Sequence, residues 1–187
     1  MGVSGCGKST VARACAERLG WAMVEGDDHH APESVAKMHA GTPLTDADRV
    51  DWLRRLAGIL ERHCVLTHGR EGARGPGSPG GRGAGAGPGL FLTCSALRRS
   101  YRELLRASCP GLGFVFLELE EGEALRRTGD RPGHFFPSIL VRSQFATLES
   151  PRGEAGVLAV DATLPVGDIA GRVVGWLGAP GADAAAC

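Results

Sequence analysis

Neither sign of charge is in excess in this 187-residue sequence, because 21 lysines and arginines balance 21 aspartates and glutamates. A surface that binds nucleic acid needs a basic excess to displace counterions from phosphates, so the balance argues against a nucleic-acid partner. Long apolar runs are also lacking, and none approaches the roughly 18 residues that make up a membrane-spanning helix. We therefore expect neither a nucleic-acid-binding protein nor a membrane protein.

The six cysteines form no C-x-x-C pair, and the N-terminus, MGVSGCGKST, has no basic segment followed by an apolar core. Disulfide-stabilised domains are usually shorter and richer in cysteine, so we expect reduced thiols. The second absence argues against a secretory signal peptide. Together they predict a cytoplasmic protein.

Glycine is the abundant residue, with 29 of 187 positions, about twice its ordinary share. Ten of these glycines lie in the 21 residues 69–89, which contain no aliphatic side chain larger than alanine. Such a segment buries too little apolar surface to offset the entropy of ordering it, so we predict a disordered loop. The tail 178–187 is predicted to be disordered for the same reason.

The rest of the chain alternates between strand patterns and helix patterns. Short apolar runs predict strands at 21–25, 90–93, 113–119 and 157–160. Apolar residues at helical spacing predict helices at 11–19, 46–63, 100–106, 138–148 and 168–177. Strands separated by helices indicate a parallel sheet with helices on both faces. We therefore predict a three-layer α/β/α fold that forms one domain over residues 1–177.

The segment GVSGCGKS at residues 2–9 fits the P-loop pattern G-x-x-x-x-G-K-[ST] at every fixed position. Its glycines let backbone N–H groups converge on phosphate oxygens, and Lys8 adds a mobile positive charge. The hydroxyl of Ser9 is the expected Mg²⁺ ligand, and the N-terminus of the following helix favours an anion. The pattern predicts that a nucleotide is bound by Gly2, Val3, Ser4, Gly5, Cys6, Gly7, Lys8, Ser9 and Thr10.

A P-loop ordinarily follows a buried strand, but only Met1 precedes it in this sequence. We therefore expect the sheet to lack its first strand. About five buried apolar side chains, at about 1.5–3 kcal/mol each, would be missing from the centre of the core. Such a loss is comparable with the whole stability of a domain, about 5–15 kcal/mol.

Several further segments have distinctive sequences. They are EGDDHH at 25–30, KMHAGTPLTDADR at 37–49, CSALRRSYR at 94–102, GHFF at 133–136 and SQFATLE at 143–149. With the P-loop, they resemble the small gluconokinases of the shikimate-kinase-like group of P-loop kinases. The resemblance covers nearly the whole chain outside the glycine-rich insert and the tail. It implies transfer of the ATP γ-phosphate to the 6-hydroxyl of D-gluconate with Mg²⁺, which feeds the pentose phosphate pathway, and a possible homodimer.

Two carboxylates, Asp27 and Asp28, follow the first predicted strand, at the sheet edge where open α/β proteins bind ligands. A carboxylate there can orient a sugar-acid hydroxyl and accept its proton. The resemblance favours Asp27, and the residues themselves leave open which of the two is the base. Glu25 stands where the family has aspartate. His30, like His29, is a candidate either for binding polyol hydroxyls or for capping the loop.

A carboxylate-bearing substrate calls for an arginine fork. Arg49, at the start of the predicted helix 46–63, is the first candidate, and Arg98 is the second. Arg99 and Arg102 lie in the same segment, and each of these arginines is alternatively a surface charge. The resemblance places Ser95 in the substrate pocket.

The resemblance also places a mobile lid at about 125–148. Arg127 and Arg131 match two family arginines there and are expected to act on the transferred phosphate. Glycine and proline at positions 129 and 132 disfavour helix, so we predict a looser lid than is usual in the family.

Two competing hypotheses remain. The absent first strand, the insert and Glu25 point to a non-catalytic or unstable nucleotide-binding variant of this fold. A second alternative keeps the enzyme and changes the acceptor to shikimate or a nucleoside monophosphate, although the acidic-histidine cluster and the GHF segment favour gluconate.

Overall fold

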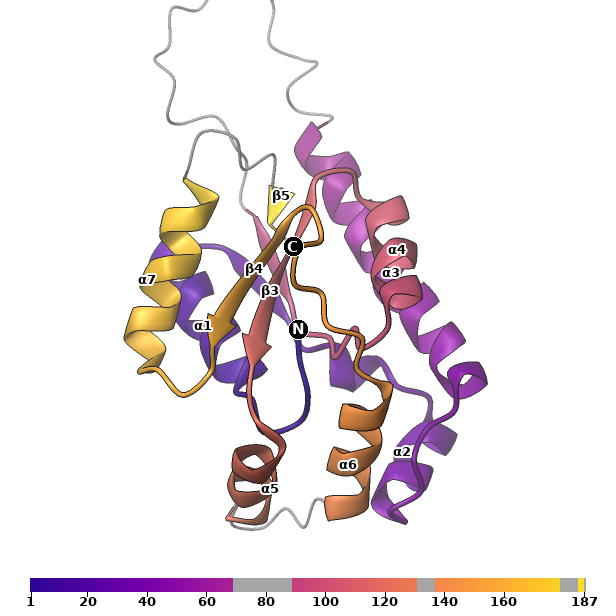
Figure 1. Ribbon diagram of the computed structural model, residues 1–187. Helices are drawn as coiled ribbons and strands as arrows, with labels where there is room; N and C mark the ends of the chain where they lie inside the picture. Colours follow the sequence, from indigo (N-terminus) through magenta and orange to yellow (C-terminus); the bar gives the residue numbers. More distant parts are fainter. Residues whose placement is uncertain (69–88, 131–136, 179–184, 187) are drawn as a thin grey trace, which may run out of the picture.

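A parallel sheet forms the centre of the computed structural model, which describes residues 1–68, 89–130, 137–178 and 185–186 (Figure 1). Its strands are β1 (Ala22–Val24), β2 (Leu90–Leu92), β3 (Leu112–Glu118), β4 (Val157–Asp161) and β5 (Ala185–Ala186). They form two groups, with the order β1-β2 in one and β4-β3-β5 in the other. All pairs are parallel, in the registers Met23↔Phe91, Phe116↔Ala159 and Leu112↔Ala185. The α/β fold with a parallel sheet is confirmed.

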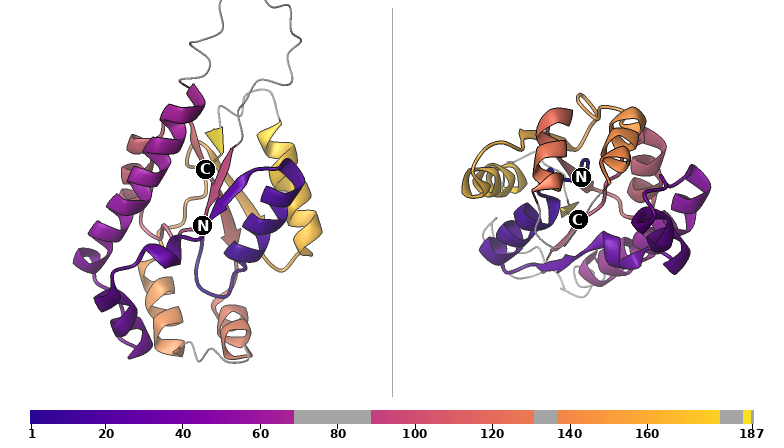
Figure 2. Two further views of the ribbon diagram at one scale, coloured as in Figure 1. Left: turned by 180° about the vertical axis from the view of Figure 1, so that it is seen from behind. Right: turned by 90° about the horizontal axis from the view of Figure 1, so that it is seen from below.

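Helices cover both faces of this sheet, as the view from below shows (Figure 2). The α-helices are α1 (Lys8–Leu19), α2 (Pro32–His39), α3 (Asp46–His68), α4 (Arg99–Ser108), α5 (Glu121–Gly129), α6 (Ser138–Thr147) and α7 (Val166–Leu177). A 3-10 helix, η1, spans Gly26–His29. Helix α1 packs on α7 at one face, and α3 packs on α4 at the other. Helices α5 and α6 stand at the carboxyl end of the sheet (Figure 1).

Every strand and helix that the periodicity predicted is present, with shifted ends. The elements missed are η1, α2, α5 and β5, which are at most nine residues long. A short element shows less than three helical turns of periodicity, so its pattern is hard to detect.

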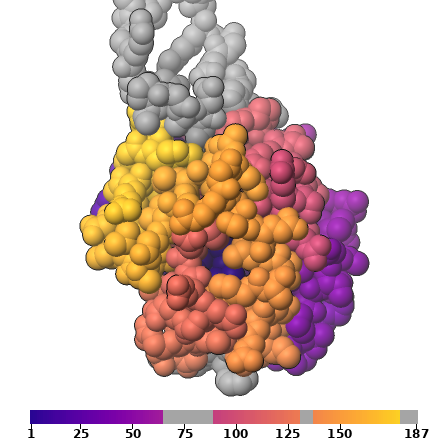
Figure 3. All heavy atoms as spheres, viewed as in Figure 1, coloured from indigo at the N-terminus to yellow at the C-terminus, as the bar shows by residue number. Residues whose placement is uncertain are grey.

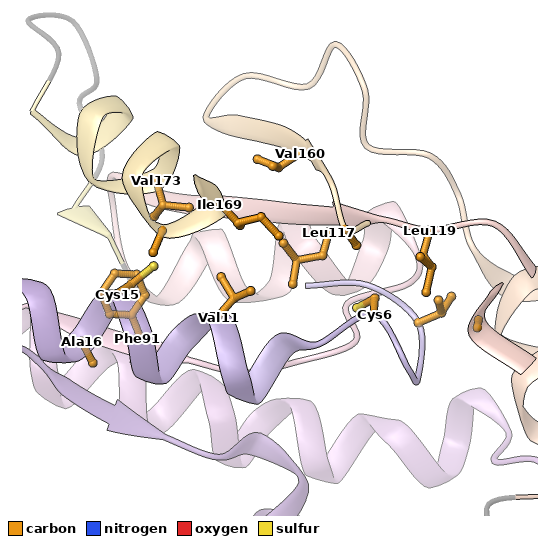
Figure 4. Packing of buried hydrophobic residues seen from close by; sticks show 14 of the residues in the cluster. Cys6, Val11, Cys15, Ala16, Phe91, Leu117, Leu119, Val160, Ile169 and Val173 are labelled. Atoms are coloured by element: carbon orange, nitrogen blue, oxygen red, sulfur yellow. The ribbon is translucent and has the colours of Figure 1, made fainter. Parts of the chain in front are cut away.

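Two apolar clusters hold the layers together, one on each face of the sheet. The first joins α1 and α7 to the strands through Val11, Cys15, Ile169, Val173 and Leu117 (Figure 4). Burial raises the pKa of the Cys15 thiol to about 11, so this cysteine is neutral at physiological pH. The second cluster lies under α3 and α4 and contains Leu53, Leu56, Leu60, Tyr101, Leu105 and Phe114. The apolar face predicted for the long helix is thus its buried face.

The prediction that the cysteines are reduced thiols is wrong for one pair. Cys64 near the end of α3 and Cys109 just after α4 form a disulfide, with their Cα atoms 5.9 Å apart. That spacing is usual for a disulfide. The pair is 45 residues apart in sequence, and the packing of α3 on α4 brings it together. Cys6, Cys15 and Cys94 are buried free thiols.

Two sequence predictions fall largely on residues outside the described ranges. Of the glycine-rich segment 69–89, only Gly89 is described, and of the tail 178–187 only Gly178, Ala185 and Ala186 are. Within the described parts of the chain, no helix combines the length and the apolar character that crossing a membrane requires.

Candidate active site

The P-loop is a tight turn between Met1 and α1. Gly5 and Gly7 have φ angles of +85° and +89°, which L-residues with a side chain rarely adopt. A Cβ atom on Gly2 would lie 2.8 Å from the carbonyl oxygen of Leu117, so the backbone passes too close to β3 for any other residue. Val3 and Cys6 are buried and anchor the loop. The loop leads directly into the first turn of α1, which begins at Lys8.

Protein groups hold the polar atoms of this loop. The Nζ atom of Lys8 donates to the carbonyl oxygens of Gly2 and Val3, at 3.1 Å each. The N–H of Ser4 donates to Oε1 of Gln144 on α6, at 2.6 Å. Both donors are of the kind that bind phosphate oxygens in a P-loop. A nucleotide that binds here must exchange these contacts for its own.

Ser9 fits the role of a Mg²⁺ ligand. It stands in the first turn of α1 and is partly exposed, whereas Thr10 is exposed. Mg²⁺ in kinases is typically held by one or two protein oxygens together with substrate phosphates and water. The described residues contain no group of three or more histidine, cysteine or acidic side chains suited to a metal, and a P-loop site does not need one.

The acidic loop begins where β1 ends and continues as η1. Gly26 is required there, because a Cβ atom on it would lie 1.9 Å from the carbonyl oxygen of Thr93. The hydroxyl of Thr93 accepts a hydrogen bond from the Gly26 N–H and donates one to the Glu25 carboxylate. Glu25 is thus held between β1 and β2. Asp27 and Asp28 follow, and both are exposed, with 69% of the Asp27 side chain accessible.

His30 is stacked on Trp52, with ring centroids 4.3 Å apart and planes 13° from parallel. The indole N–H of Trp52 donates to the Gly26 carbonyl at 2.7 Å, which fixes α3 against η1. Only 4% of the His30 side chain is exposed, and burial lowers its pKa, so the ring is neutral at pH 7. Its Nδ1 atom is buried and has no hydrogen-bond partner in the described structure. A buried polar atom of this kind is costly unless a ligand satisfies it.

Arg49 and Arg98 converge on Asp46 at the N-terminus of α3. The distances from their guanidinium nitrogens to the Asp46 carboxylate are 3.9 and 3.3 Å. The hydroxyl of Tyr101 donates to the same carboxylate at 2.5 Å. Arg49 is 8% exposed, and the Nε atom of Arg98 is buried without a hydrogen-bond partner in the described structure. The Nε–H of Arg98 therefore remains available as a donor for a further partner.

A pocket of about 60 Å³ beside the P-loop is lined by four of the six predicted substrate-binding residues. Among its lining residues are Ser4, Lys8, Asp27, His30, Arg49 and Ser95. The structure thus brings together residues that are up to 91 positions apart, from Ser4 to Ser95. The N-terminal residues, indigo in Figure 3, are visible at the bottom of a hollow between α5 and α6.

Two predicted substrate residues do not line this pocket. Asp28 is exposed outside it, and Arg98 pairs with Asp46, which also lies outside the lining. The remaining lining residues were assigned no role from the sequence: Met38, Pro43, Leu44, Trp52, Leu140, Ser143 and Gln144. Gln144 and Ser143 belong to a segment that carried the family resemblance, and Trp52 lies three residues after Arg49 on the same helical face. These two signals in the sequence could have identified Ser143, Gln144 and Trp52 as pocket residues.

The lid arginine Arg127 is not among the residues that line this pocket. Arg127 on α5 donates to the Glu123 carboxylate at 2.6 Å and to the Ala162 carbonyl at 3.0 Å. Arg131 and the GHF segment lie outside the described residues, so the looser lid stays a prediction. Helix α5 itself ends at Gly129, and Thr128 on it is buried close to Gly5 of the P-loop.

Arg102, one of the arginines expected near the substrate, is a structural residue. It is fully buried and donates to the Glu154 carboxylate and to the carbonyl oxygens of Ala96 and Leu97. Ala96 has a φ of +44°, which is unfavourable for a residue with a side chain. Arg102 therefore holds the strained loop that carries Ser95 into the pocket. Arg99 lies at the surface in an ion pair with Glu103.

Comparison with known proteins decides the family. A gluconokinase of Gluconobacter oxydans is 45% identical over 162 residues, which cover 86% of this chain and 79% of that protein. The chain belongs to the gluconokinase family. A solved gluconokinase from Sinorhizobium meliloti aligns with a TM-score of 0.75 at 41% identity, over 94% of this chain and 87% of that one.

A shikimate kinase from Acinetobacter baumannii, 19% identical, aligns with a TM-score of 0.50 over 92% of this chain and 87% of that one. This likeness concerns the fold alone. No family model matches the chain. The P-loop kinase fold and the gluconokinase family, both predicted from the sequence, are confirmed.

Proposed function

We propose that this chain catalyses the transfer of the γ-phosphate of ATP to the 6-hydroxyl of D-gluconate, forming 6-phospho-D-gluconate. The observation that carries the proposal is the single pocket in which Lys8, Asp27, His30 and Arg49 meet beside the P-loop. It combines a phosphate-binding cation, a carboxylate base, a neutral hydrogen-bonding ring and a guanidinium group. The gluconokinase relatives agree with this assignment.

The phosphate side of the reaction belongs to the P-loop. The N–H groups of residues 4–9 and the Lys8 ammonium bind the β- and γ-phosphates once Gln144 and the loop carbonyls release them. The Ser9 hydroxyl would hold Mg²⁺ together with the phosphates, and the ion would supply positive charge for the transferred group. The chain thereby stabilises charge without forming a covalent intermediate.

The acceptor side begins at Asp27. A sugar hydroxyl is a poor nucleophile, and a carboxylate that orients it and accepts its proton is worth about 10²- to 10⁴-fold in rate. Asp27 lines the pocket beside Lys8, whereas Asp28 does not. We therefore assign the base to Asp27. His30 offers its unpartnered Nδ1 atom to a polyol hydroxyl.

The carboxylate of gluconate binds at the opposite end of the acceptor, at Arg49. Arg49 is buried at the pocket wall, and its guanidinium group lies 3.9 Å from the Asp46 carboxylate, which is long enough for a bidentate substrate carboxylate to compete for it. Arg98 shares Asp46 and supplies a second positive charge at the edge. An uncharged hexitol lacks the group that this end recognises.

The test is ADP release by the purified chain with ATP and Mg²⁺, with D-gluconate, shikimate, AMP or no acceptor. We expect release that depends on gluconate. Lys8→Ala should abolish it, and Asp27→Asn should lower kcat at least 100-fold. Asp28→Asn tests which of the two carboxylates, Asp27 or Asp28, acts as the base. Asp51→Asn, on the exposed face of α3, is the matched control, and its activity should be unchanged.

Arg49→Lys keeps the positive charge but loses the fork, so it should raise KM for gluconate more than it lowers kcat. Preferential release with shikimate or AMP would instead assign a different acceptor. A folded sample that binds ATP but releases no ADP with gluconate would support the non-catalytic alternative.

A further inference from the structure

One side chain, the amide of Gln144 on α6, belongs to both substrate sites. Its Oε1 atom accepts the N–H of Ser4 in the P-loop at 2.6 Å, across 140 positions of sequence. The same residue lines the pocket that also contains Asp27, His30 and Arg49. The N-terminal residues are visible at the bottom of the hollow beside α6 (Figure 3). Gln144 therefore lies between the loop that binds phosphate and the groups that bind the acceptor.

Helix α6 presents this amide from an anchored backbone. Leu140 and Val141 on the helix are buried. Just after the helix, the Glu149 N–H donates to the Leu97 carbonyl at 2.8 Å, and the Glu149 carboxylate accepts from the Arg99 N–H at 2.7 Å. These contacts tie the carboxyl end of α6 to the start of α4. A change of partner at Gln144 therefore needs only rotation about its own side-chain bonds.

The chemistry of an amide decides which partners Gln144 can exchange. A backbone N–H is a donor, so the oxygen of the amide faces Ser4, and Nε2 has no hydrogen-bond partner among the described residues. When a phosphate oxygen takes the Ser4 N–H, Oε1 loses its donor. Phosphate oxygens are themselves acceptors, so they cannot replace that donor, and their negative charge repels the amide oxygen. The released Oε1 must find a donor elsewhere.

A polyol hydroxyl supplies what the released amide lacks. It donates through its hydrogen to Oε1, and its oxygen can accept from Nε2. We propose that ATP binding transfers Gln144 from Ser4 to a hydroxyl of the sugar acid, and that this exchange makes the two substrates bind cooperatively. The identity of the acceptor rests on the function proposed above. Gln144 itself lines the pocket where that acceptor binds.

The exchange fixes the sign and the size of the coupling. A sugar acid that binds alone competes with Ser4 for Gln144, and bound ATP removes this competition. ATP that binds alone must break the bond between Ser4 and Gln144, which a bound sugar acid has already weakened. Each substrate thus raises the affinity of the other by the same factor, as linkage requires. One hydrogen bond of ordinary strength limits that factor to about fivefold.

The test is calorimetric titration of the purified chain with D-gluconate, with and without Mg²⁺ and a saturating non-hydrolysable ATP analogue. The dissociation constant without the analogue, divided by the constant with it, measures the coupling. We expect this ratio to be about fivefold larger in the parent than in Gln144→Ala. Repulsion between the two anionic ligands is present in both proteins, so it cancels when their ratios are compared.

Arg142→Gln is the matched control. Arg142 lies on the same helix, its side chain is 70% exposed beside Glu121, and it is not part of the pocket lining. This variant should keep the ratio of the parent. Equal ratios in the parent and Gln144→Ala would overturn the proposal. A ratio in Arg142→Gln as low as that of Gln144→Ala would also overturn it, because the effect would then belong to the helix and not to the amide.

The release of Gln144 from Ser4 is tested without an acceptor. With the analogue and Mg²⁺ alone, Gln144→Ala should bind more tightly than the parent, because it has no bond to Ser4 that must break. Equal or weaker binding would overturn the exchange even if gluconate is turned over. Failure of the proposed function looks different. D-gluconate would then neither bind nor support ADP release while the analogue still binds Gln144→Ala more tightly, which would overturn the transfer of the amide to a sugar acid.

Discussion

Replacing Glu154 with glutamine would leave a fully buried arginine without its counter-ion. Arg102 is 0% exposed, and its Nε atom lies 3.0 Å from one Glu154 oxygen, with Nη2 on the other. The Glu154 side chain is 14% exposed and also accepts from Arg106. Glutamine keeps the shape but removes the charge and one acceptor. The two carbonyl groups that Arg102 also reaches cannot neutralise it.

The expected loss is large for one atom exchanged. Breaking a buried ion pair by removing one partner costs about 3–5 kcal/mol, and the partial exposure of Glu154 favours the lower end. For a domain of this size, about 3 kcal/mol corresponds to a melting temperature lower by roughly 6–12 °C. Glu103→Gln is the matched control, because its ion pair with Arg99 is exposed and worth less than about 1 kcal/mol.

The same carboxylate gives a pH dependence of known sign. Hydrogen bonds from Arg102 lower the pKa of Glu154 below its ordinary value of 4.5. Its contribution is therefore present above the unfolded pKa and is lost as pH falls through the lower folded pKa. Circular dichroism should be used to melt the parent and Glu154→Gln from pH 7 to pH 3. The difference between their melting temperatures should narrow below about pH 4.5. A Glu154→Gln variant that melts like Glu103→Gln at pH 7 would refute the reasoning.

Three further outcomes follow from the site. Gln144→Ala frees the Ser4 N–H, so a non-hydrolysable ATP analogue should bind about fivefold more tightly by calorimetry, a gain of about 1 kcal/mol; weaker binding would mean that Gln144 also contacts the nucleotide. Gly26→Ala places a Cβ 1.9 Å from the carbonyl oxygen of Thr93, so this variant should show no cooperative thermal melt. A cooperative melt near that of the parent would show that η1 can shift. Trp52→Phe keeps a ring against His30 but leaves the Gly26 carbonyl buried and unpaired, so chemical denaturation should show a loss of about 1–3 kcal/mol, and an unchanged midpoint would contradict the role of that bond.

The parts of the site that were predictable from sequence are those whose chemistry is local. The P-loop needs its glycines, Lys8 and Ser9 at fixed spacing, because the turn and the start of α1 are formed by consecutive residues. Arg49 and Trp52 are likewise linked by the repeat of a single helix, α3. The acidic loop after β1 was placed correctly because the carboxyl ends of parallel strands share one edge of the sheet.

Arg98, Arg99 and Arg102 show where sequence reasoning stopped. They lie within five positions of one another, but their roles differ. Arg98 pairs with Asp46, Arg99 forms a surface ion pair, and Arg102 is a buried structural residue. Their spacing in the sequence does not predict which arginine has which role. Their roles depend on Asp46, Glu103 and Glu154, and Glu154 is 52 residues from Arg102. The direction of each side chain follows from which partner the packing of α4 brings within reach.

By itself, the sequence determined the α/β class, the phosphate loop, the gluconokinase family and six of the thirteen residues that line the pocket, because each rests on periodicity or on a contiguous motif. Only the tertiary structure decided that Gln144 reaches the P-loop, that Cys64 meets Cys109 and that β5 pairs with β3. Those contacts join segments that are 140, 45 and about 73 positions apart, and no local pattern encodes them. They arise because burying the two apolar clusters leaves one arrangement of the layers in which these groups meet.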